Sequence, residues 1–130
     1  MIMRKPQRKE DFTPFGLWIP ENCKSSRDGL SVSNLDYVFE DFKKKRLMLV
    51  EEKRYNGALY HAQRLTFKVL DKMLRQVARS HGYDYWGFYL VVLAKELPED
   101  GVRLNGNPVS VDQLIKHLNF EVKACDPMTL

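Results

Sequence analysis

The feature that most constrains the fold is a long amphipathic segment, residues 56–82, that lies between strand-like segments. Asn56 can cap a helix at its start, and Gly82 can end that helix. Apolar residues recur within it at steps of three and four, as they do along one face of a helix. These residues are Leu59, Ala62, Val69, Leu70, Met73, Leu74 and Val77. A helix of this length needs a sheet or other helices to cover its apolar face.

Strand-like segments precede and follow this helix. Residues 34–41 and 46–54 are predicted strands joined by a short, basic connection, and residues 84–97 are rich in aromatic and β-branched residues. An Asn105-Gly106 turn signal follows, and Ser110 with Gln113 has the spacing of a capping box before a last helix. The order β-β-α-β, then a small turn and a helix, predicts an α/β or α+β domain with a mixed central sheet flanked by helices.

The first thirty residues are less regular. Residues 1–10 are predicted to form a flexible basic arm that includes Arg4 and Lys5, and residues 11–130 are predicted to form a single domain. A short helical turn is expected to start at Pro20, because proline is favoured at the first helical position.

Composition sets the broad class. Hydrophobic residues make up 44% of the 130-residue chain and charged residues 29%, which is typical of a folded globular protein. A net charge of +4 weakly favours an anionic partner. Cys23 and Cys125 lie far apart and have no ligand-like spacing to the three histidines, so we expect reduced thiols in a cytoplasmic protein. No segment is long and apolar enough to predict a membrane partner.

Charged residues interrupt the predicted hairpin at its open end. Side chains alternate between the two faces of a strand, so Glu51 and Lys53 continue the apolar stripe of Leu47 and Leu49. Asp36 stands at the head of the other strand. With Lys43 and Lys44 as a two-residue loop, Asp36 falls opposite Glu51.

A loop wider by two residues would instead place Asp36 opposite Lys53. In either register the three charged groups share one face at the rim of the core. Two carboxylates with Cβ atoms about 5 Å apart repel each other, and a hard divalent cation removes that conflict. Lys53 could then stabilise phosphate charge or orient an attacking water. The alternative is a solvated cross-strand ion pair with no chemical role.

The order of these residues resembles the core of the PD-(D/E)XK nuclease superfamily. The matching pattern is Asp36, fourteen intervening residues, and then Glu51-Glu52-Lys53, and the resemblance covers roughly residues 30–95. It implies a restriction-endonuclease-like mixed sheet and cleavage of DNA or RNA with Mg²⁺ or Mn²⁺. Asp36 and Glu51 would hold the metal, with the backbone carbonyl of Glu52 as a further ligand, and Lys53 would polarise the water or the phosphate.

Gln63 extends the resemblance. In RecB-like branches of the superfamily a Gln on the following helix precedes a Tyr by four residues, and this chain has Gln63 and then Phe67. Leu35 stands where the family has its Pro, and Glu21 is a poor counterpart for the family's upstream acid. Gln63 lies within about 40° of an apolar stripe on a helical wheel, so its amide needs hydrogen-bond partners. These partners are either the site, which the resemblance implies, or backbone groups.

Basic residues are the predicted contacts to nucleic acid. Lys43, Lys44 and Lys45 in the hairpin connection, with Arg4 and Lys5 in the arm, are predicted to hold a substrate beside the site. The predicted helix also carries a basic stripe about 140° around its axis from Gln63, which we interpret as a solvated outer face. This stripe comprises Arg64, Lys68, Lys72, Arg75 and Arg79.

Histidines and aromatic residues are assigned to the structure. His61, His81 and His117 have no mutual metal spacing, so a structural role is expected for each. Four aromatic residues are expected to pack in the core and not to stack on bases: Trp18, Tyr83, Tyr85 and Trp86.

The sequence therefore predicts a small metal-dependent nuclease whose substrate is DNA, or RNA. The alternatives are a non-catalytic nuclease-like module that binds nucleic acid or protein, such as an inhibitor or accessory factor, and a structural protein. Because one small domain offers little surface to a duplex, a homodimer or a larger complex is also expected.

Overall fold

The computed structural model describes residues 13–130, and the chain divides between Val32 and Ser33 into two units. The predicted domain over residues 11–130 spans both units. The predicted basic arm, with Arg4 and Lys5, lies outside the described residues.

The described part of the first unit contains helix α1 (Pro14–Asn22) and a 3₁₀ turn at Ser26–Asp28. The prediction that a helical turn starts at Pro20 is wrong, because Pro20 lies inside α1. The Thr13 hydroxyl accepts a hydrogen bond from the Gly16 amide at 3.0 Å and caps the helix, which begins at Pro14, six residues before Pro20. Trp18 was expected in a core but is half exposed, stacked on Phe15 with ring centroids 5.8 Å apart.

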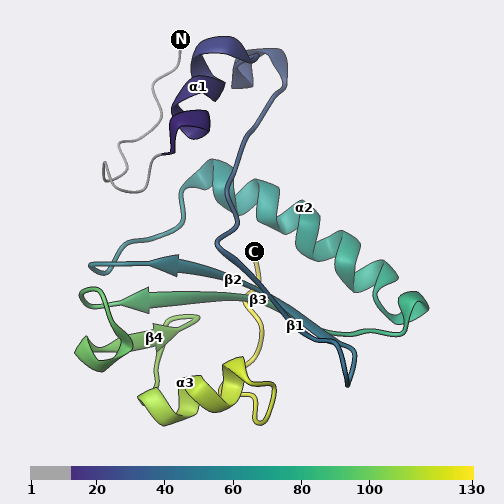
Figure 1. The fold of residues 1–130 in the computed structure, drawn as a ribbon, viewed down its shortest axis with the longest axis vertical. Helices are drawn as coiled ribbons and strands as arrows, with labels where there is room; N and C mark the ends of the chain where they lie inside the picture. The colour runs from purple at the N-terminus through teal and green to yellow at the C-terminus, as the bar shows by residue number, and fades with distance from the viewer. Residues whose placement is uncertain (1–12) are drawn as a thin grey trace. The chain divides into compact units, whose positions relative to one another are not determined.

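The second unit, Ser33–Leu130, is built on one five-stranded mixed sheet in the order β1-β2-β3-β4-β5 (Figure 1). Strands β1 (Tyr37–Asp41) and β2 (Arg46–Lys53) form an antiparallel hairpin. Helix α2 (His61–Val77) then returns the chain, so that β3 (Asp84–Leu93) pairs with β2 in parallel. The predicted mixed sheet flanked by helices is confirmed.

Shorter elements complete the sheet. Strands β4 (Val102–Leu104) and β5 (Asn107–Pro108) continue it with antiparallel pairs around the predicted Asn105-Gly106 turn. Helix α3 (Val111–Leu118) follows, and the predicted capping box is present. In it the Ser110 hydroxyl accepts from the Gln113 amide at 3.0 Å, and the Gln113 side chain accepts from the Ser110 amide at 2.8 Å.

Each face of the sheet has its own apolar cluster. Helix α2 and the C-terminal segment cover the cluster on one face, where Phe67 and Phe88 stack with ring centroids 5.1 Å apart. Helix α3 covers the other face, where Trp86 packs edge-on against Phe120. Figure 1 shows α2 and α3 on opposite sides of the sheet. His117 is fully buried against this cluster, with its ring centroid 4.2 Å from that of Tyr89.

Helix α2 begins later than predicted. Asn56 does not cap it; Tyr55 and Asn56 have φ angles of 53° and 55°, and their amides donate to the carbonyls of Lys95 and Leu93. These contacts hold the loop against the end of β3, so the helix begins only at His61. Gly82, with φ 78°, ends the following 3₁₀ turn as predicted for the end of the helical segment.

The predicted apolar face of α2 is only partly correct. Its buried residues are Gln63, Phe67 and Asp71, whereas Val69 and Met73 point toward solvent with 55% and 59% of their surface exposed. Apolar residues extend around more of the helix than the sheet can cover. The spacing of apolar residues at steps of three and four identified the helix, but it could not decide which part of this broad apolar surface lies on the sheet.

Candidate functional site

The register of the β1–β2 hairpin brings the two predicted carboxylates together. Tyr37 pairs with Val50 and Asp41 pairs with Arg46, so the next position beyond the ladder places Asp36 opposite Glu51. The first of the two predicted registers is therefore confirmed. Pairing ends at Asp41 and Arg46, one position short of the predicted two-residue loop on each strand, so residues 42–45 form the turn without a change of register. Lys45 adopts a φ of 59° in place of the glycine that the sequence lacks.

Asp36 and Glu51 hold each other through the backbone. The Asp36 amide donates to Glu51 Oε1 at 3.0 Å, and the Glu52 amide donates to Asp36 Oδ2 at 2.9 Å. These bonds stand where the ladder of backbone pairs has ended. Backbone amides at the end of the hairpin thus hold both carboxylates in place.

Lys53 and Gln63 complete the cluster. Lys53 Nζ lies 3.5 Å from Glu51 Oε2 and donates to Gln63 Oε1 at 3.0 Å. The Gln63 amide nitrogen donates to Glu51 Oε2 at 3.3 Å, and the Gln63 oxygen also accepts from the Tyr60 amide at 3.1 Å. Both alternatives for Gln63 therefore hold at once, since it contacts the site and also caps the first turn of α2.

Tyr60 is a member of the cluster that the sequence analysis did not identify. Its ring lies 4.7 Å from Lys53 Nζ, measured to the ring centroid, in a cation–π contact. Tyr60 precedes α2 directly, and that position depends on where the helix starts. Because the sequence predicted a start near Asn56, no local signal placed Tyr60 beside Lys53.

Burial sets the charge state of Glu51. Only 2% of its surface is exposed, and burial together with the nearby Asp36 charge raises its pKa to about 7. The Asp36 amide and the Lys53 ammonium act in the opposite direction and are too weak to cancel this. Near neutral pH this carboxyl therefore exchanges a proton readily.

The donor set fits a hard divalent cation. Asp36 and Glu51 offer two carboxylates, and Mg²⁺ in proteins is commonly bound by one or two carboxylates with water in its other positions. Residues 13–130 contain no group of three or more His, Cys, Asp and Glu side chains arranged to hold a metal. Because side chains alternate between the faces of β2, the Glu52 side chain lies on the opposite face from Glu51, which leaves the Glu52 backbone carbonyl as its candidate ligand.

The predicted nucleic-acid contacts lie away from this cluster. Lys43, Lys44 and Lys45 occupy the closed end of the hairpin, five strand residues from Asp36, which is about 16 Å at the usual rise per residue. Arg4 and Lys5 are outside the described residues. The hairpin lysines are therefore not immediate neighbours of the carboxylates.

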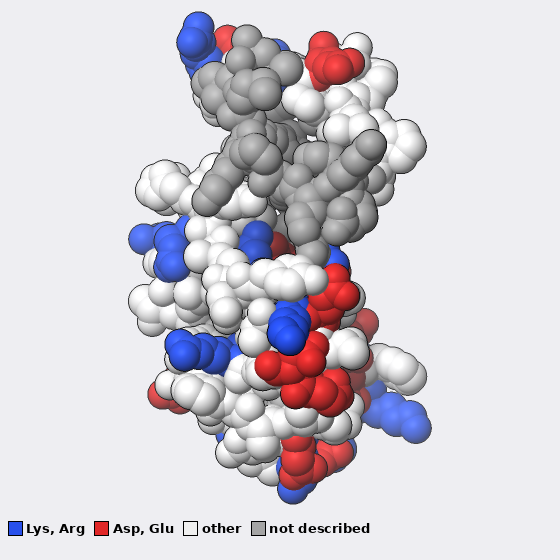
Figure 2. All heavy atoms as spheres, turned by 90° about the vertical axis from the view of Figure 1, so that its left-hand side faces the viewer, with Lys and Arg blue, Asp and Glu red and all other residues white. Residues whose placement is uncertain are grey.

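The end of the sheet at which β2 and β3 finish is mixed in charge. In the view toward this end, acidic side chains gather along one border, and Lys and Arg occupy separate places among uncharged residues (Figure 2). Carboxylates at this surface attract cations and repel anions.

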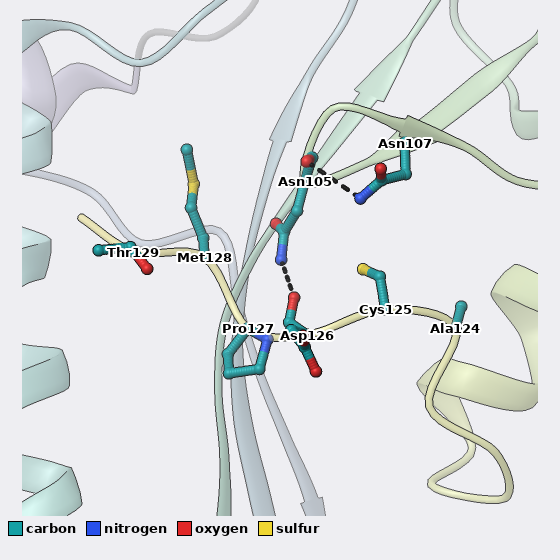
Figure 3. A pocket seen from close by; sticks show the side chains of 8 residues that line it. All are labelled: Asn105, Asn107, Ala124, Cys125, Asp126, Pro127, Met128 and Thr129. Atoms are coloured by element: carbon teal, nitrogen blue, oxygen red, sulfur yellow. Dashed lines mark hydrogen bonds between the residues drawn. The ribbon is translucent and has the colours of Figure 1, made fainter.

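A separate pocket of about 610 Å³ lies beside the C-terminal segment, lined by residues such as Asn105, Cys125 and Asp126 (Figure 3). The Asn105 side chain is already engaged, because it accepts from the Leu90 amide at 2.7 Å and donates to the Asp126 carbonyl at 2.9 Å. Burial raises the pKa of the Cys125 thiol, which disfavours its reactive thiolate form. The pocket shows no reactive group comparable to the cluster around Glu51.

Comparisons with known proteins give no named function for this chain. No family model matches the chain, and no solved structure matches it. A protein of Archaeoglobus fulgidus, described as uncharacterized, is 38% identical over 61 residues, which cover 46% of this chain and 42% of that protein. The chain thus aligns with less than half the length of this relative. Among the described residues, no helix has the length and apolar character needed to cross a membrane.

Proposed function

We propose that this protein is a metal-dependent nuclease that hydrolyses phosphodiester bonds, with DNA as the first candidate substrate and RNA as the second. The observation that supports this most is the placement of Asp36 opposite Glu51 with Lys53 Nζ 3.5 Å from the same carboxylate. The resemblance of these residues to the PD-(D/E)XK pattern points to the same chemistry.

Asp36, Glu51 and the backbone carbonyl of Glu52 would hold Mg²⁺ or Mn²⁺. The cation supplies positive charge that stabilises the phosphate as its negative charge rises during attack. Burial and the Asp36 charge raise the pKa of Glu51, and a cation between the two carboxylates would offset both effects, because it stabilises the ionised form.

Residues of the chain position the reactants. Lys53, held by Gln63 and by the Tyr60 ring, directs its ammonium toward the Glu51 carboxylate and toward a phosphate bound there. In the reaction a water oxygen forms a bond to phosphorus and gives up a proton, one phosphorus–oxygen bond of the backbone breaks, and the leaving oxygen takes up a proton. The Gln63 amide does not ionise at ordinary pH, so Gln63 acts by fixing Lys53 and Glu51.

One observation favours a second candidate, a non-catalytic nuclease-like module that binds nucleic acid or protein as an inhibitor or accessory factor. The amide of Gln63 and the ammonium of Lys53 are satisfied by groups of the cluster itself. A closed network of this kind can hold a hairpin and a helix together without any ligand. For either role, a homodimer or a larger complex is proposed as the working assembly.

Cation binding and cleavage separate these candidates. Mn²⁺ binding is measured by calorimetry, and cleavage is measured on single-stranded, duplex and branched DNA and on RNA. Asp36→Asn and Glu51→Gln should each abolish binding and cleavage, and Lys53→Met should abolish cleavage while Mn²⁺ still binds. Glu121→Gln, at an exposed position on the α3 side of the unit, is the matched control. Mn²⁺ binding without cleavage of any substrate would favour the non-catalytic module, and an absence of Mn²⁺ binding contradicts the nuclease.

A further inference from the structure

Helix α2 has a largely apolar face that the described residues of its own unit, Ser33–Leu130, leave exposed. Its members are 36% to 59% exposed: Leu65, Val69, Leu70, Met73 and Val77. At 100° per residue they span an arc of about 140° that contains no charged residue. Isolated exposed apolar side chains are ordinary, but a gathered set of this size marks an interaction surface.

The spacing of this face suits another helix. Leu65, Val69, Met73 and Val77 follow one another at steps of four and form one ridge. Such a ridge packs into the groove of a second helix in the commonest class of helix crossing. A lipid surface presents no groove for such a ridge to fit. The opposite side of α2 already packs on the sheet through Phe67.

The sheet beside α2 leaves room on the same side. Val38 of β1 pairs with Leu49, whose side chain lies in the cluster under α2, so Val38 points to that face of the sheet and is 58% exposed. Arg75, in contrast, leans toward Gly87 and Pro127 over β3. The flank of α2 that carries Leu70 therefore faces toward β1. The exposed apolar residues of α2 and Val38 thus lie on the same side of the sheet and can contact one partner.

Charge decides between the helices that could lie there. Along the other border of the exposed face stand Lys72 and Arg79, with Lys68 next to them, and among residues 13–130 no ion pair joins an acidic side chain to these three. A second copy of α2 has no acid to offer, because Asp71 is buried and bound to Tyr85 and Arg75. Pairing two such helices brings no opposite charge to this basic border.

We propose that this apolar face docks an amphipathic helix of another protein, with acidic residues along the flank that meets Lys72 and Arg79. The apolar ridge supplies the buried contact, and the basic border fixes the orientation of the partner. This proposal stands independently of the nuclease activity.

The probe is a designed helical peptide of about 21 residues, three heptads, with Leu at the core positions and Glu along the flanks. Two controls have Lys in place of every Glu, or the same residues in scrambled order. By fluorescence anisotropy the full-length protein should bind the acidic peptide with a Kd on the order of 10 μM, and each control at least about tenfold more weakly.

Matched variants locate the contact. Val69→Asp should weaken binding about tenfold or more, whereas Ile115→Asp, on the exposed side of α3, should not change it. The double variant Lys72→Glu with Arg79→Glu should reverse the preference, so that the Lys peptide binds more tightly. Thermal unfolding of each variant confirms that the fold is retained.

Three results would overturn the proposal. Equal binding of the acidic, Lys and scrambled peptides, or no binding at all, removes the helix partner. A dimer in sedimentation that Val69→Asp dissociates assigns the face to a second copy. Co-sedimentation with vesicles of anionic lipid that the same variant abolishes assigns it to a membrane surface.

Discussion

At the scale of single residues, the cluster at the open end of the hairpin contains a buried carboxyl that folding makes harder to ionise. Glu51 has a pKa of about 7 in the folded protein and about 4.5 in the unfolded chain. Its contribution to stability is complete below pH 4.5 and is lost as the pH rises through 7. The full difference corresponds to about 3 kcal/mol.

Glu51→Gln should therefore remove the part of the pH dependence that lies between 4.5 and 7. The variant should lack the loss of stability that ionisation of Glu51 causes in the wild type as the pH rises, because an amide does not ionise. Urea unfolding followed by circular dichroism at several pH values measures this. Glu121→Gln should leave the wild-type curve unchanged, and identical curves for Glu51→Gln and wild type would show that Glu51 is not perturbed.

His117 should titrate in the opposite sense. Its Nδ1 accepts from the Ala124 amide at 3.0 Å inside the core, and burial, followed by the Lys123 charge, lowers its pKa to about 4. The neutral ring stabilises the fold fully above pH 6.5, and this stability is lost as the pH falls toward 4. NMR titration of the ring carbon protons should show no protonation of His117 at pH 5.5. A midpoint near 6.5 for His117 would contradict the buried geometry.

At the scale of elements, the sequence was sufficient for the kinds of structure but not for their contacts. Alternation along the hairpin predicted that Glu51 and Lys53 share a face, and the strand lengths allowed Asp36 to meet Glu51; both follow from local geometry. The start of α2 was wrong because the carbonyls of Leu93 and Lys95, forty residues away, hold the preceding loop. Tyr60 reached Lys53 only as a result of that shift.

Strand β3 contains a glycine whose replacement tests the packing of the C-terminal segment. Gly87 has φ 112° at an irregularity in the pairing with β2, and a Cβ there would lie 2.4 Å from the Pro127 Cβ. Gly87→Ala should lower the free energy of unfolding by about 2–4 kcal/mol, from backbone strain together with overpacking.

Gly106→Ala is the matched control for this prediction. Its φ is 83° and a Cβ would meet nothing within 4 Å, so only backbone strain remains, about 1 kcal/mol. Urea unfolding measures both variants. Equal losses for the two would show that Pro127 moves aside, and that the C-terminal segment is not closely packed on β3.

At the scale of the whole molecule, two buried ionisable groups oppose each other. Between pH 4.5 and 6.5, acid favours the fold through Glu51 and disfavours it through His117, and the two slopes are of similar size. Wild-type stability should therefore change little across this interval. Glu51→Gln should expose a loss of stability toward acid, measured as the urea midpoint, and a steep wild-type slope would show that the two pKa shifts are unequal.

The packing of the whole domain decides which apolar residues of α2 are exposed, and the sequence could not predict this. An apolar stripe on a helix usually marks its core side, and here the apolar residues of α2 continue past the sheet contact onto the exposed side. Only the position of Phe67 over the sheet, set by residues distant in the sequence, separates the two sets. The hairpin lysines lie at the far end of β1 from the carboxylates, and their contact with a substrate stays a prediction.

The hydrogen bond from the Asp36 amide to Glu51 Oε1 gives the cluster a spectroscopic reporter of its own. An amide proton that faces a carboxylate resonates at a frequency set by the charge on that oxygen. One cross-peak in a nitrogen–proton spectrum should consequently register a proton gained by Glu51, a cation arriving beside it, or the removal of Lys53, each without any substrate in the tube.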